Sequence, residues 1–431
     1  MTATFKDKIL NVTTKSPYAL QFEGIRFLHD TSYCILGDEM GLGKTLQAII
    51  AAYLTGKRTL VVCPANLRQT WKMEIENTIK AWVDIELFEN QTLAYPQNDT
   101  QFVIISYNML VHCEHLFDWA QIVIGDECQA LKERTSIQSE LFNKYLYEYI
   151  PDKLMLMSGT PLINDVTEWW SILSMCSYST MGDNGLDVHK AFPEQIIWNR
   201  LFTFKKTIGI GGGRYVEKYT GFRNKEILKK YLRGKYLRRL AKNELDLPKL
   251  LSKEVIISFK DDLALQEAWE AHQKDKSKGS AAKAKSALVK APFTAQYAKD
   301  IQKAQGSPVL VYTDHRDSAA KLGKDLKCPV ITGLTTILQR EALVKKFQSG
   351  QIPHMVCTIG SMGTGRTLTK ARDLILNDIS WKPGENAQVY KRIHRIGQLY
   401  DCTIHHIIGS RQDQHIKKIN REKEAVLREA M

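Results

Sequence analysis

Short apolar runs rich in β-branched residues alternate with helical patterns along most of this 431-residue chain. Runs with apolar residues on both faces are typical of strands buried in a parallel sheet. Such runs occupy residues 59–64, 102–107, 122–127, 153–160, 309–314, 354–359, 373–378 and 403–408. Helical spacing fills segments between them, including residues 45–54, 67–82, 316–326 and 337–347. The alternation predicts an α/β protein with two doubly wound parallel-sheet lobes.

The two groups of runs set the expected domain boundaries. We expect a first lobe over residues 1–164, a helical insertion and inter-lobe connection over 165–250, and a second lobe over 251–431 that ends in a helix. A glycine cluster at 209–213 has no strand pattern before it, so a loop is expected there. Residues 274–291 are rich in Lys, Ala and Ser and form either a solvated helix or a flexible basic link. We expect them to be an exposed excursion within the second lobe.

The chain carries a net charge of +13. This excess suits a polyanionic partner, nucleic acid first, although a soluble protein that happens to be basic has the same charge. The eight cysteines form no CxxC pair, and several lie in apolar runs, which favours buried reduced thiols. No apolar run reaches the roughly 20 residues of a membrane helix. The first residues lack the apolar core of a secretory signal. A reducing, intracellular location is expected, either cytoplasmic or associated with the nucleoid.

The segment "GDEMGLGKT" at residues 37–45 is similar to a phosphate-binding loop. The strict pattern is Gly, four residues, and then Gly-Lys-Thr or Gly-Lys-Ser; Gly43, Lys44 and Thr45 fit, but Asp38 replaces the first Gly. Backbone N–H groups before a helix bind phosphates, while Lys44 would reach the β- and γ-phosphates and Thr45 would bind Mg²⁺. The predicted nucleotide-binding residues are Asp38, Glu39, Met40, Gly41, Leu42, Gly43, Lys44 and Thr45.

The run "IVIGDECQ" at residues 122–129 ends in two adjacent carboxylates, Asp126 and Glu127. In the predicted sheet this strand end lies beside the phosphate loop. Asp126 can then hold Mg²⁺ through water, and Glu127 can orient and deprotonate the attacking water. Two solvated acids at a strand end are the alternative, but a phosphate loop at this separation favours the catalytic interpretation.

These motifs, together with "SGTPLIN" at 158–164, resemble those of superfamily-two ATPases of the Swi/Snf type. "DECQ" stands in place of the usual DEAH-type box, and that family's phosphate loop begins Asp-Glu-Met-Gly. The resemblance therefore implies that Asp38 is the family's own variant and that ATP and Mg²⁺ are the cofactors. It also implies roles for individual residues: Gln21 reads adenine, Ser158 and Thr160 couple hydrolysis to movement, and Asn66, Ser106 and Tyr107 lie in segments that touch DNA.

The segment "QVYKRIHRIGQ" at residues 388–398 resembles the last motif of the same family. Two arginines at this spacing lie on one helical face, or on a helix and the turn after it. Arg392 and Arg395 would act as arginine fingers on the γ-phosphate, because the guanidinium forks onto phosphate oxygens. Gln388 takes a coupling role in the resemblance. A basic surface helix is the alternative.

Other segments of the second half resemble the nucleotide-facing and DNA-facing parts of that family. Gly365 falls in the nucleotide-binding motif of residues 358–384, where Arg366 replaces a residue that is often apolar. The resemblance places His315, Thr332, Gly333 and Thr358 against DNA. Residues 232–250 match the Arg-Arg and Leu-Pro signature that joins the lobes. His405 and His406 lie within an apolar run and are expected to be structural.

Together these features predict an ATP-dependent DNA translocase or helicase that remodels forked or branched DNA. The nearest resemblance is to compact annealing and branch-migration helicases of phage or bacterial type. The expected partner is duplex and branched DNA, with a monomeric chain, no membrane and no evident protein partner. Basic residues of 223–242 either hold a second DNA arm or form a solvated helix. An RNA or general unwinding helicase, a protein-displacing remodeller, a restriction motor and a non-enzymatic binding module are the alternatives.

Overall fold

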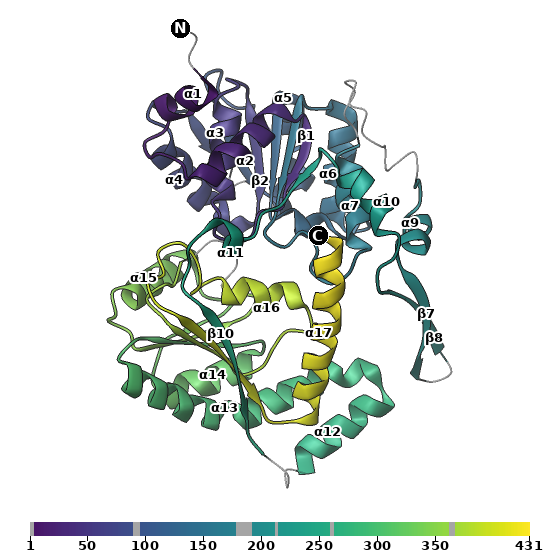
Figure 1. Cartoon of the computed structure of the whole chain (residues 1–431), viewed down its shortest axis with the longest axis vertical. Coiled ribbons are helices and arrows are strands. Elements are labelled where there is room, and N and C mark those ends of the chain that lie inside the picture. Colours follow the sequence, from purple (N-terminus) through teal and green to yellow (C-terminus); the bar gives the residue numbers. More distant parts are fainter. Residues whose placement is uncertain (1–3, 89–94, 178–191, 212–213, 259–262, 362–366) are drawn as a thin grey trace. The chain divides into compact units, whose positions relative to one another are not determined.

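The computed structural model describes residues 4–88, 95–177, 192–211, 214–258, 263–361 and 367–431 (Figure 1). Gly365 and Arg366 therefore lie outside the described residues. The chain divides into two compact units: residues 1–204, 221–244 and 429–431 form the first, and residues 205–220 and 245–428 form the second. Each unit contains its own sheet.

The first unit contains a sheet of seven parallel strands in the order β3-β4-β2-β5-β6-β1-β9. The strands are β1 (Tyr33–Leu36), β2 (Thr59–Cys63), β3 (Ile85–Leu87), β4 (Phe102–Ser106), β5 (Ile122–Asp126), β6 (Lys153–Met157) and β9 (Tyr236–Leu237). The helices are α1 (Phe5–Val12), α2 (Ala19–Asp30), α3 (Lys44–Tyr53), α4 (Arg68–Thr78), α5 (Glu114–Trp119), α6 (Ile137–Tyr149), α7 (Glu168–Met175), α9 (Gln195–Phe202), α10 (Lys225–Leu232) and α11 (Ala241–Glu244). Short 3₁₀ turns are η1 (Ala65–Leu67), η2 (Tyr107–His112) and η3 (Cys128–Leu131).

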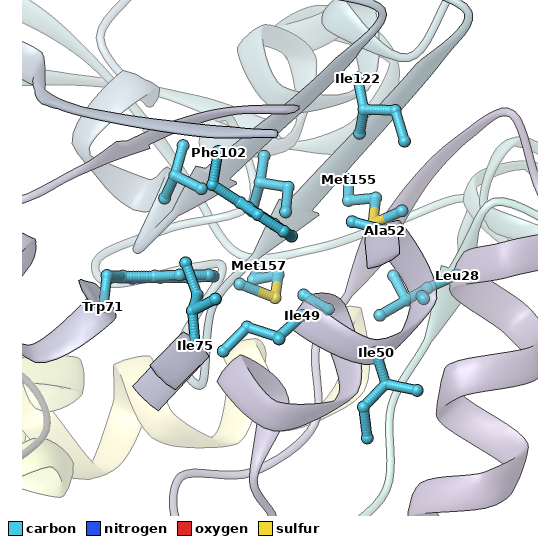
Figure 2. Close-up of a cluster of buried hydrophobic side chains, with 14 of the residues drawn as sticks. Leu28, Ile49, Ile50, Ala52, Trp71, Ile75, Phe102, Ile122, Met155 and Met157 are labelled. Carbon is cyan, nitrogen blue, oxygen red and sulfur yellow. The ribbon is translucent and has the colours of Figure 1, made fainter. Parts of the chain in front are cut away.

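Both faces of this sheet are covered, because β2, β4 and β5 are buried at every position. On one face, side chains of α2, α3 and α4 pack against alternate strand residues; Figure 2 shows Leu28, Ile49 and Trp71 among them. On the other face of β5, a Cβ built on Gly125 would lie 3.7 Å from the Phe142 ring of α6. The core therefore fixes the strand ends, from which the loops of the candidate site emerge.

The second unit contains a sheet of six parallel strands in the order β10-β15-β14-β11-β13-β12. The strands are β10 (Leu250–Ile256), β11 (Val309–Thr313), β12 (Val330–Ile331), β13 (His354–Thr358), β14 (Asp373–Leu376) and β15 (Cys402–Ile408). The helices are α12 (Leu263–Lys274), α13 (Gly279–Gln305), α14 (Arg316–Leu326), α15 (Ile337–Gln348), α16 (Pro383–Tyr390) and α17 (Arg411–Ala430), and η4 (Lys276–Lys278) is a 3₁₀ turn. Two separate apolar clusters pack on this sheet's strands. The predicted fold class, two doubly wound α/β lobes, is confirmed.

Residues 274–291 are not the exposed excursion that their composition suggests. Most of them belong to α13, whose buried positions recur at helical spacing and include Lys283 and Lys290, 1% and 0% exposed. Lys290 Nζ donates to Asp413 Oδ1 at 2.8 Å, and Lys283 Nζ lies 3.6 Å from Asp378 Oδ2 and also pairs with Asp314. Each lysine charge is thus neutralised inside the unit, which is why a segment rich in lysine forms part of the core.

The middle of the chain also differs from its expectation. β7 (Phe204–Gly211) and β8 (Arg214–Thr220) pair as a two-stranded sheet where helical and irregular structure was predicted. Residues 209–211 of the glycine cluster thus belong to β7 where a loop was predicted, and residues 212–213 lie outside the described residues. Further along, Tyr236–Leu237 forms the short strand β9, which pairs with β1. This strand lies within the segment of the Arg-Arg signature, where no strand was predicted.

Two smaller expectations hold. Every cysteine is a free thiol, and all except the half-buried Cys328 are buried. His405 is structural: its Nε2 lies 2.8 Å from Asp373 Oδ1 and its Nδ1 lies 3.0 Å from the Tyr297 hydroxyl. Within the described ranges, no helix combines the length and apolar character needed to cross a bilayer.

Candidate functional site

The predicted phosphate loop joins the end of β1 to the start of α3 at Lys44. Gly41 and Gly43 have φ of 93° and 76°, backbone conformations that side chains disfavour. A Cβ on Gly43 would also lie 2.3 Å from Gln21 Nε2. The first amides of α3 point out of this tight turn without intrahelical partners, which gives the loop the donors that an anion requires.

Lys44 extends back over its own loop. Its Nζ donates to the carbonyl oxygen of Asp38 at 2.7 Å and lies 3.5 Å from that of Glu39. Burial lowers the pKa of Lys44, while the nearby carboxylates of Glu127, Asp38 and Asp126 act in the opposite direction. The ammonium is thus held by neutral carbonyl groups, so its charge can still meet a phosphate.

Asp126 ends β5 and is supported from three directions. The Trp71 indole N–H donates to Asp126 Oδ2 at 2.9 Å, and the backbone N–H of Glu127 donates to Oδ1 at 2.9 Å. The Tyr107 hydroxyl donates to the backbone carbonyl of Asp126 at 2.8 Å. Burial, followed by the charge of Glu127, raises the pKa of Asp126 to about 7, although the Trp71 hydrogen bond and Lys44 oppose that rise. Trp71 was missed as a site residue because a tryptophan within a helical pattern is ordinarily a core residue.

Glu127 has a strained backbone. Its φ of 52° and ψ of 51° are in the left-handed region, where a non-glycine residue costs about 1–3 kcal/mol. Gln129 Nε2 donates to Glu127 Oε2 at 2.6 Å and fixes the carboxylate. The direction of the Glu127 side chain is thus set by the left-handed turn and not by the alternation of the strand before it. Neither the strain nor the Gln129 contact was evident in the sequence.

Gln21 is buried beside the phosphate loop. Its Oε1 accepts from the backbone N–H of Tyr18 at 2.9 Å, and its Nε2 donates to the carbonyl of Leu42 at 3.1 Å. Both ends of the side-chain amide are engaged within the first unit, so its role toward adenine stays a prediction. Gln47, which sequence reasoning missed, donates to the same Leu42 carbonyl at 3.0 Å.

The loop after β6 carries Ser158 and Thr160 and lies against the phosphate loop. Both residues are buried, and the Thr160 N–H donates to Ser158 Oγ at 2.9 Å. A Cβ on Gly159 would come within 2.3 Å of Met40 Cγ, which shows how closely the two loops pack. Glu168, the first residue of α7, accepts from the backbone N–H of Ile163 in this loop at 2.6 Å. This packing is compatible with coupling, which stays a prediction.

Predicted DNA contacts in the first unit differ in exposure. Asn66 lies half-buried in η1, after the end of β2. Ser106 and Tyr107 are 3% and 5% exposed, and Tyr107 supports Asp126 from inside the unit. Asn108, the third residue of the same segment, is exposed. Contact between Ser106 or Tyr107 and DNA stays a prediction, against which their burial argues.

Predicted DNA contacts in the second unit gather at one edge of its sheet. His315, Thr332 and Thr358 follow or end β11, β12 and β13, which are neighbouring parallel strands. Gly333 is exposed in the loop after β12. Carboxyl ends of parallel strands meet at the same edge, so the fold brings these four residues to one edge, and their contact with DNA stays a prediction.

The two predicted arginine fingers lie on the turn after α16 rather than on a continuous helical face. Arg392 is buried and Arg395 is half-buried, while Gln388 lies half-buried in α16 itself. The buried Gln398 holds this turn: its Nε2 donates to the carbonyl of Ile393 at 3.0 Å, and its Oε1 accepts from the Leu399 N–H at 3.0 Å.

A second group of possible metal ligands occurs in the second unit. Asp314, His315 and Asp378 each bring one ligand atom to within 4.8 Å of the others. However, the Lys283 ammonium already pairs with both carboxylates. The pairing with Lys283 already neutralises charge on these carboxylates, so we do not assign a metal ion to this group, and Thr45 and Asp126 stay the predicted Mg²⁺ ligands.

Comparisons with known proteins agree with this geometry. The SNF2-related domain model matches residues 21–298, and the helicase conserved C-terminal domain model matches residues 292–397. The chain belongs to the SNF2-related family. The predicted Swi/Snf-type resemblance is thereby confirmed, as is the predicted enzyme class, a helicase-type ATPase.

Curated relatives of this SNF2-related chain include two vertebrate proteins. The DNA annealing helicase and endonuclease ZRANB3 of Homo sapiens is 25% identical over 434 residues, covering 90% of this chain and 38% of the relative. The SWI/SNF-related matrix-associated actin-dependent regulator of chromatin subfamily A-like protein 1 of Xenopus tropicalis is 26% identical over 439 residues, covering 95% and 44%.

A bacterial relative and a solved structure are also similar. An uncharacterized ATP-dependent helicase of Mycoplasma genitalium is 24% identical, covering 94% of this chain and 41% of the relative. The chain thus spans about two fifths of the length of these curated relatives. The Sulfolobus solfataricus SWI2/SNF2 ATPase core in complex with dsDNA has 19% identity and a TM-score of 0.45, covering 96% of this chain and 94% of that chain.

Proposed function

We propose that this chain is an ATP-dependent, DNA-stimulated translocase that remodels forked or branched DNA. The observation that carries the proposal is the first unit's edge, where a glycine-shaped phosphate loop, Lys44 and two supported carboxylates converge in a member of the SNF2-related family. The relative named as a DNA annealing helicase supports the branched substrate.

The residues present fit a magnesium nucleotide. The positive φ of Gly41 and Gly43 gives the loop its tight turn, and Lys44 places a cation over that turn. Thr45 and Asp126 would hold Mg²⁺, which neutralises charge on the phosphates when bound. Glu127 would take the proton of the attacking water, because Gln129 keeps its carboxylate aimed. Arg392 and Arg395 would supply guanidinium charge to the γ-phosphate.

DNA would be held through its phosphates. The net charge of +13 supports this, as do His315, Thr332, Gly333 and Thr358 at one sheet edge. Asn66 would add a contact from the first unit. Because backbone contacts carry no direct sequence information, little base preference is expected.

A second DNA arm along residues 223–242 is not supported. Most basic side chains there have partners inside the first unit: Lys225 pairs with Glu429, Lys229 pairs with Glu226, and buried Lys235 donates to the Cys176 carbonyl. Arg238 and Arg239 contact the phosphate loop and its neighbours. Of the two readings of this segment, the structural one is favoured, so a branched substrate must be recognised elsewhere.

The test is steady-state ATP hydrolysis with nucleic acids of matched length. The panel contains linear duplex, fork, four-way junction, single-stranded DNA and duplex RNA. We expect stimulation by DNA, greatest with the fork and junction, and little by RNA. A Lys44→Ala preparation, purified in parallel, measures contaminating ATPase. Equal stimulation by RNA would favour the RNA helicase, and no stimulation by any strand would refute the proposal.

Branch remodelling is separated from simple unwinding by a second measurement. Junction migration replaces each broken base pair with a new one, whereas unwinding loses stacking of about 1.4 kcal/mol per step. Labelled four-way junctions and tailed duplexes are compared at equal ATP hydrolysis rates. Tailed duplexes opened as fast as junctions migrate would replace the remodelling proposal with a general unwinding helicase.

A further inference from the structure

Asp38 stands where the strict phosphate loop has glycine, yet its side chain is directed away from a ligand. The residue is 0% exposed. Its Oδ1 accepts from the Arg239 N–H at 3.0 Å and from Arg239 Nε at 3.1 Å, while its Oδ2 accepts from Arg239 Nη2 at 2.5 Å. One residue, 201 positions later in the chain, thus occupies both carboxylate oxygens. The nucleotide-binding role predicted for Asp38 stays a prediction, but both of its carboxylate oxygens already have a partner within the chain.

Arg239 reaches this position because the chain around it runs beside the loop. β9 pairs with the end of β1, and the pairing continues past both strands: the Gly37 N–H donates to the Leu237 carbonyl at 2.7 Å, and the Glu39 N–H donates to the Arg239 carbonyl at 2.9 Å. Arg238 Nη1 donates to the Gly37 carbonyl at 2.8 Å. Backbone hydrogen bonds from β9 and the residues after it therefore hold the start of the phosphate loop in place.

The same pair reaches the predicted catalytic lysine. The Asp38 carbonyl accepts from Lys44 Nζ at 2.7 Å, so the residue that Arg239 fixes through its side chain fixes Lys44 through its backbone. A second path runs through Gln47, whose Oε1 accepts from Arg239 Nη2 at 3.0 Å and whose Nε2 donates to the Leu42 carbonyl at 3.0 Å. Arg239 is thereby connected to both ends of the loop.

Arg239 is buried and closely packed. A Cβ built on Gly24 of α2 would lie 2.6 Å from Arg239 Nη2 and 1.7 Å from Gln47 Oε1. Arg239 Nη1 also donates to the Leu20 carbonyl of the same helix. Four elements thus enclose the guanidinium: α2, the phosphate loop, α3 and the residue's own strand extension.

We propose that Arg239 and Asp38 form a positioning pair that holds the phosphate loop in the shape that receives nucleotide phosphates. Asp38 is an anchor for the loop rather than a nucleotide ligand. Arg239 belongs to the chain that leaves the first unit at Glu244 and enters the second unit at the next residue. The shape of the loop is therefore sensitive to the segment that connects the two units. This inference rests on the proposed nucleotide site.

The test uses Asp38→Asn, Arg239→Gln and the double variant, with Arg233→Gln as a matched control. Arg233 is exposed on the same segment. Arg239→Gln leaves the buried Asp38 carboxylate without its guanidinium partner, and Asp38→Asn leaves Arg239 paired with Glu23, a largely exposed carboxylate whose Oε2 lies 3.3 Å from Nη1. The double change removes both members of the buried pair and keeps groups that can hydrogen-bond. We expect each single variant to bind a fluorescent ADP analogue about tenfold more weakly, about 1.4 kcal/mol, and the double variant to lose less than the sum of the two.

Hydrogen exchange of amides 37–45 in the nucleotide-free protein gives a readout that needs no ligand. Exchange should be faster in both single variants and unchanged in Arg233→Gln. If a single variant fails to fold, Asp38→Gly replaces it, because this change restores the strict loop pattern but removes the anchor. Asp38→Gly should also weaken ADP binding.

Three results decide between the possibilities. A lower unfolding midpoint with unchanged ADP affinity and unchanged loop exchange would reduce the pair to a stability element and overturn the proposal. Additive losses in the double variant would show that the two residues act independently and would overturn it as well. Absence of ADP binding by the wild-type chain would instead refute the nucleotide site, a failure that is distinct from that of the positioning pair.

Discussion

The two parallel sheets carry buried or half-buried lysines near their carboxyl edges, but these lysines have different partners. In the first unit, Lys44 Nζ contacts the carbonyl oxygens of Asp38 and Glu39. In the second unit, Lys283 and Lys290 form ion pairs with buried or half-buried carboxylates. The contrast is between a cation held by neutral groups and cations whose charge is already neutralised.

This difference indicates which edge has capacity for an anionic ligand. A carbonyl oxygen orients an ammonium without cancelling its charge, so Lys44 can still attract phosphate. A buried ion pair has little to gain from a further anion, and breaking it costs about 3–5 kcal/mol because one charge is left uncompensated. Similar doubly wound folds therefore place one lysine for ligand binding and two for the integrity of the core.

The largest effect should come from Glu127→Gln in the first unit. The amide keeps the size of the side chain but cannot accept the proton of the attacking water, so hydrolysis should fall by about 10²–10⁴. Nucleotide affinity should stay near the wild-type value, since Glu127 is not expected to bind the phosphates. Single-turnover hydrolysis and equilibrium binding of a fluorescent ATP analogue measure the two quantities.

Glu133→Gln is the matched control, because this carboxylate is 71% exposed and lies 4.0 Å from the Lys132 ammonium in a weak surface pair. The hydrolysis rate and the nucleotide affinity of this variant should equal those of the wild type. Hydrolysis by Glu127→Gln at the wild-type rate would show that another group takes the proton and that the strained turn at residue 127 has some other purpose.

The next effect separates the two kinds of lysine directly. Lys290→Met should lower the free energy of unfolding by about 3 kcal/mol, near the lower end for a broken buried pair, because Asp413 keeps other hydrogen bonds. Those bonds come from the N–H groups of Gly409 and Ser410, at 2.9 and 3.0 Å. Lys44→Met should leave stability nearly unchanged and remove nucleotide binding. Urea unfolding and nucleotide titration test the pair of variants.

Lys285→Met is the control on the same helix, since Lys285 is exposed one residue away from the buried Ser286. Its unfolding midpoint should match the wild type. If Lys44→Met destabilises the chain as much as Lys290→Met does, the two lysines have the same structural role and the contrast between the edges is wrong.

The same contrast explains what the sequence could reveal. Parallel strands such as β2, β4, β11 and β13 are buried at every position and mostly apolar on both faces, so their pattern predicted both sheets. The glycines of the phosphate loop and the carboxylates at the end of β5 were also recognisable, because ligand-binding loops require particular residue types at fixed spacing.

Helix α13 shows where sequence reasoning ended. Its buried stripe recurs at helical spacing but consists of small residues and lysines, among them Ala282, Lys283, Ala287 and Lys290. Lysine is rarely buried unless it is paired, so the pattern resembled a solvated segment. The carboxylate partners of these lysines lie 31 to 123 residues away in the chain. The Arg239–Asp38 pair was missed for the same reason, since a separation of 201 residues leaves no local signal.

The smallest effect concerns His406 in the second unit and depends on pH. Burial lowers the pKa of His406 from 6.5 to about 4, with Lys417 adding to the shift and Glu254 opposing it. The unfolded chain therefore binds a proton near pH 6.5, whereas the folded chain does so only near pH 4. Stability from this group is complete above pH 6.5 and is lost as the pH falls towards 4, by at most about 3 kcal/mol.

His406→Gln isolates this contribution, because other groups titrate over the same range. The groups that face His406 come from three further elements: Glu254 lies opposite it on β10, the Tyr390 ring of α16 is 5.9 Å from its ring, and Lys417 and Arg421 extend from α17. Its neighbour His405 shares β15.

The difference in urea unfolding free energy between wild type and variant is measured at pH 7.5, 6.0 and 5.0. The wild type should lose more stability than His406→Gln at each step down, by up to about 1.4 kcal/mol per pH unit for one proton. If the unfolding free energies of the wild type and His406→Gln change in parallel with pH, water reaches His406 in the folded state. The charged groups around His406 are then hydrated, unlike the buried ion pair of Lys290.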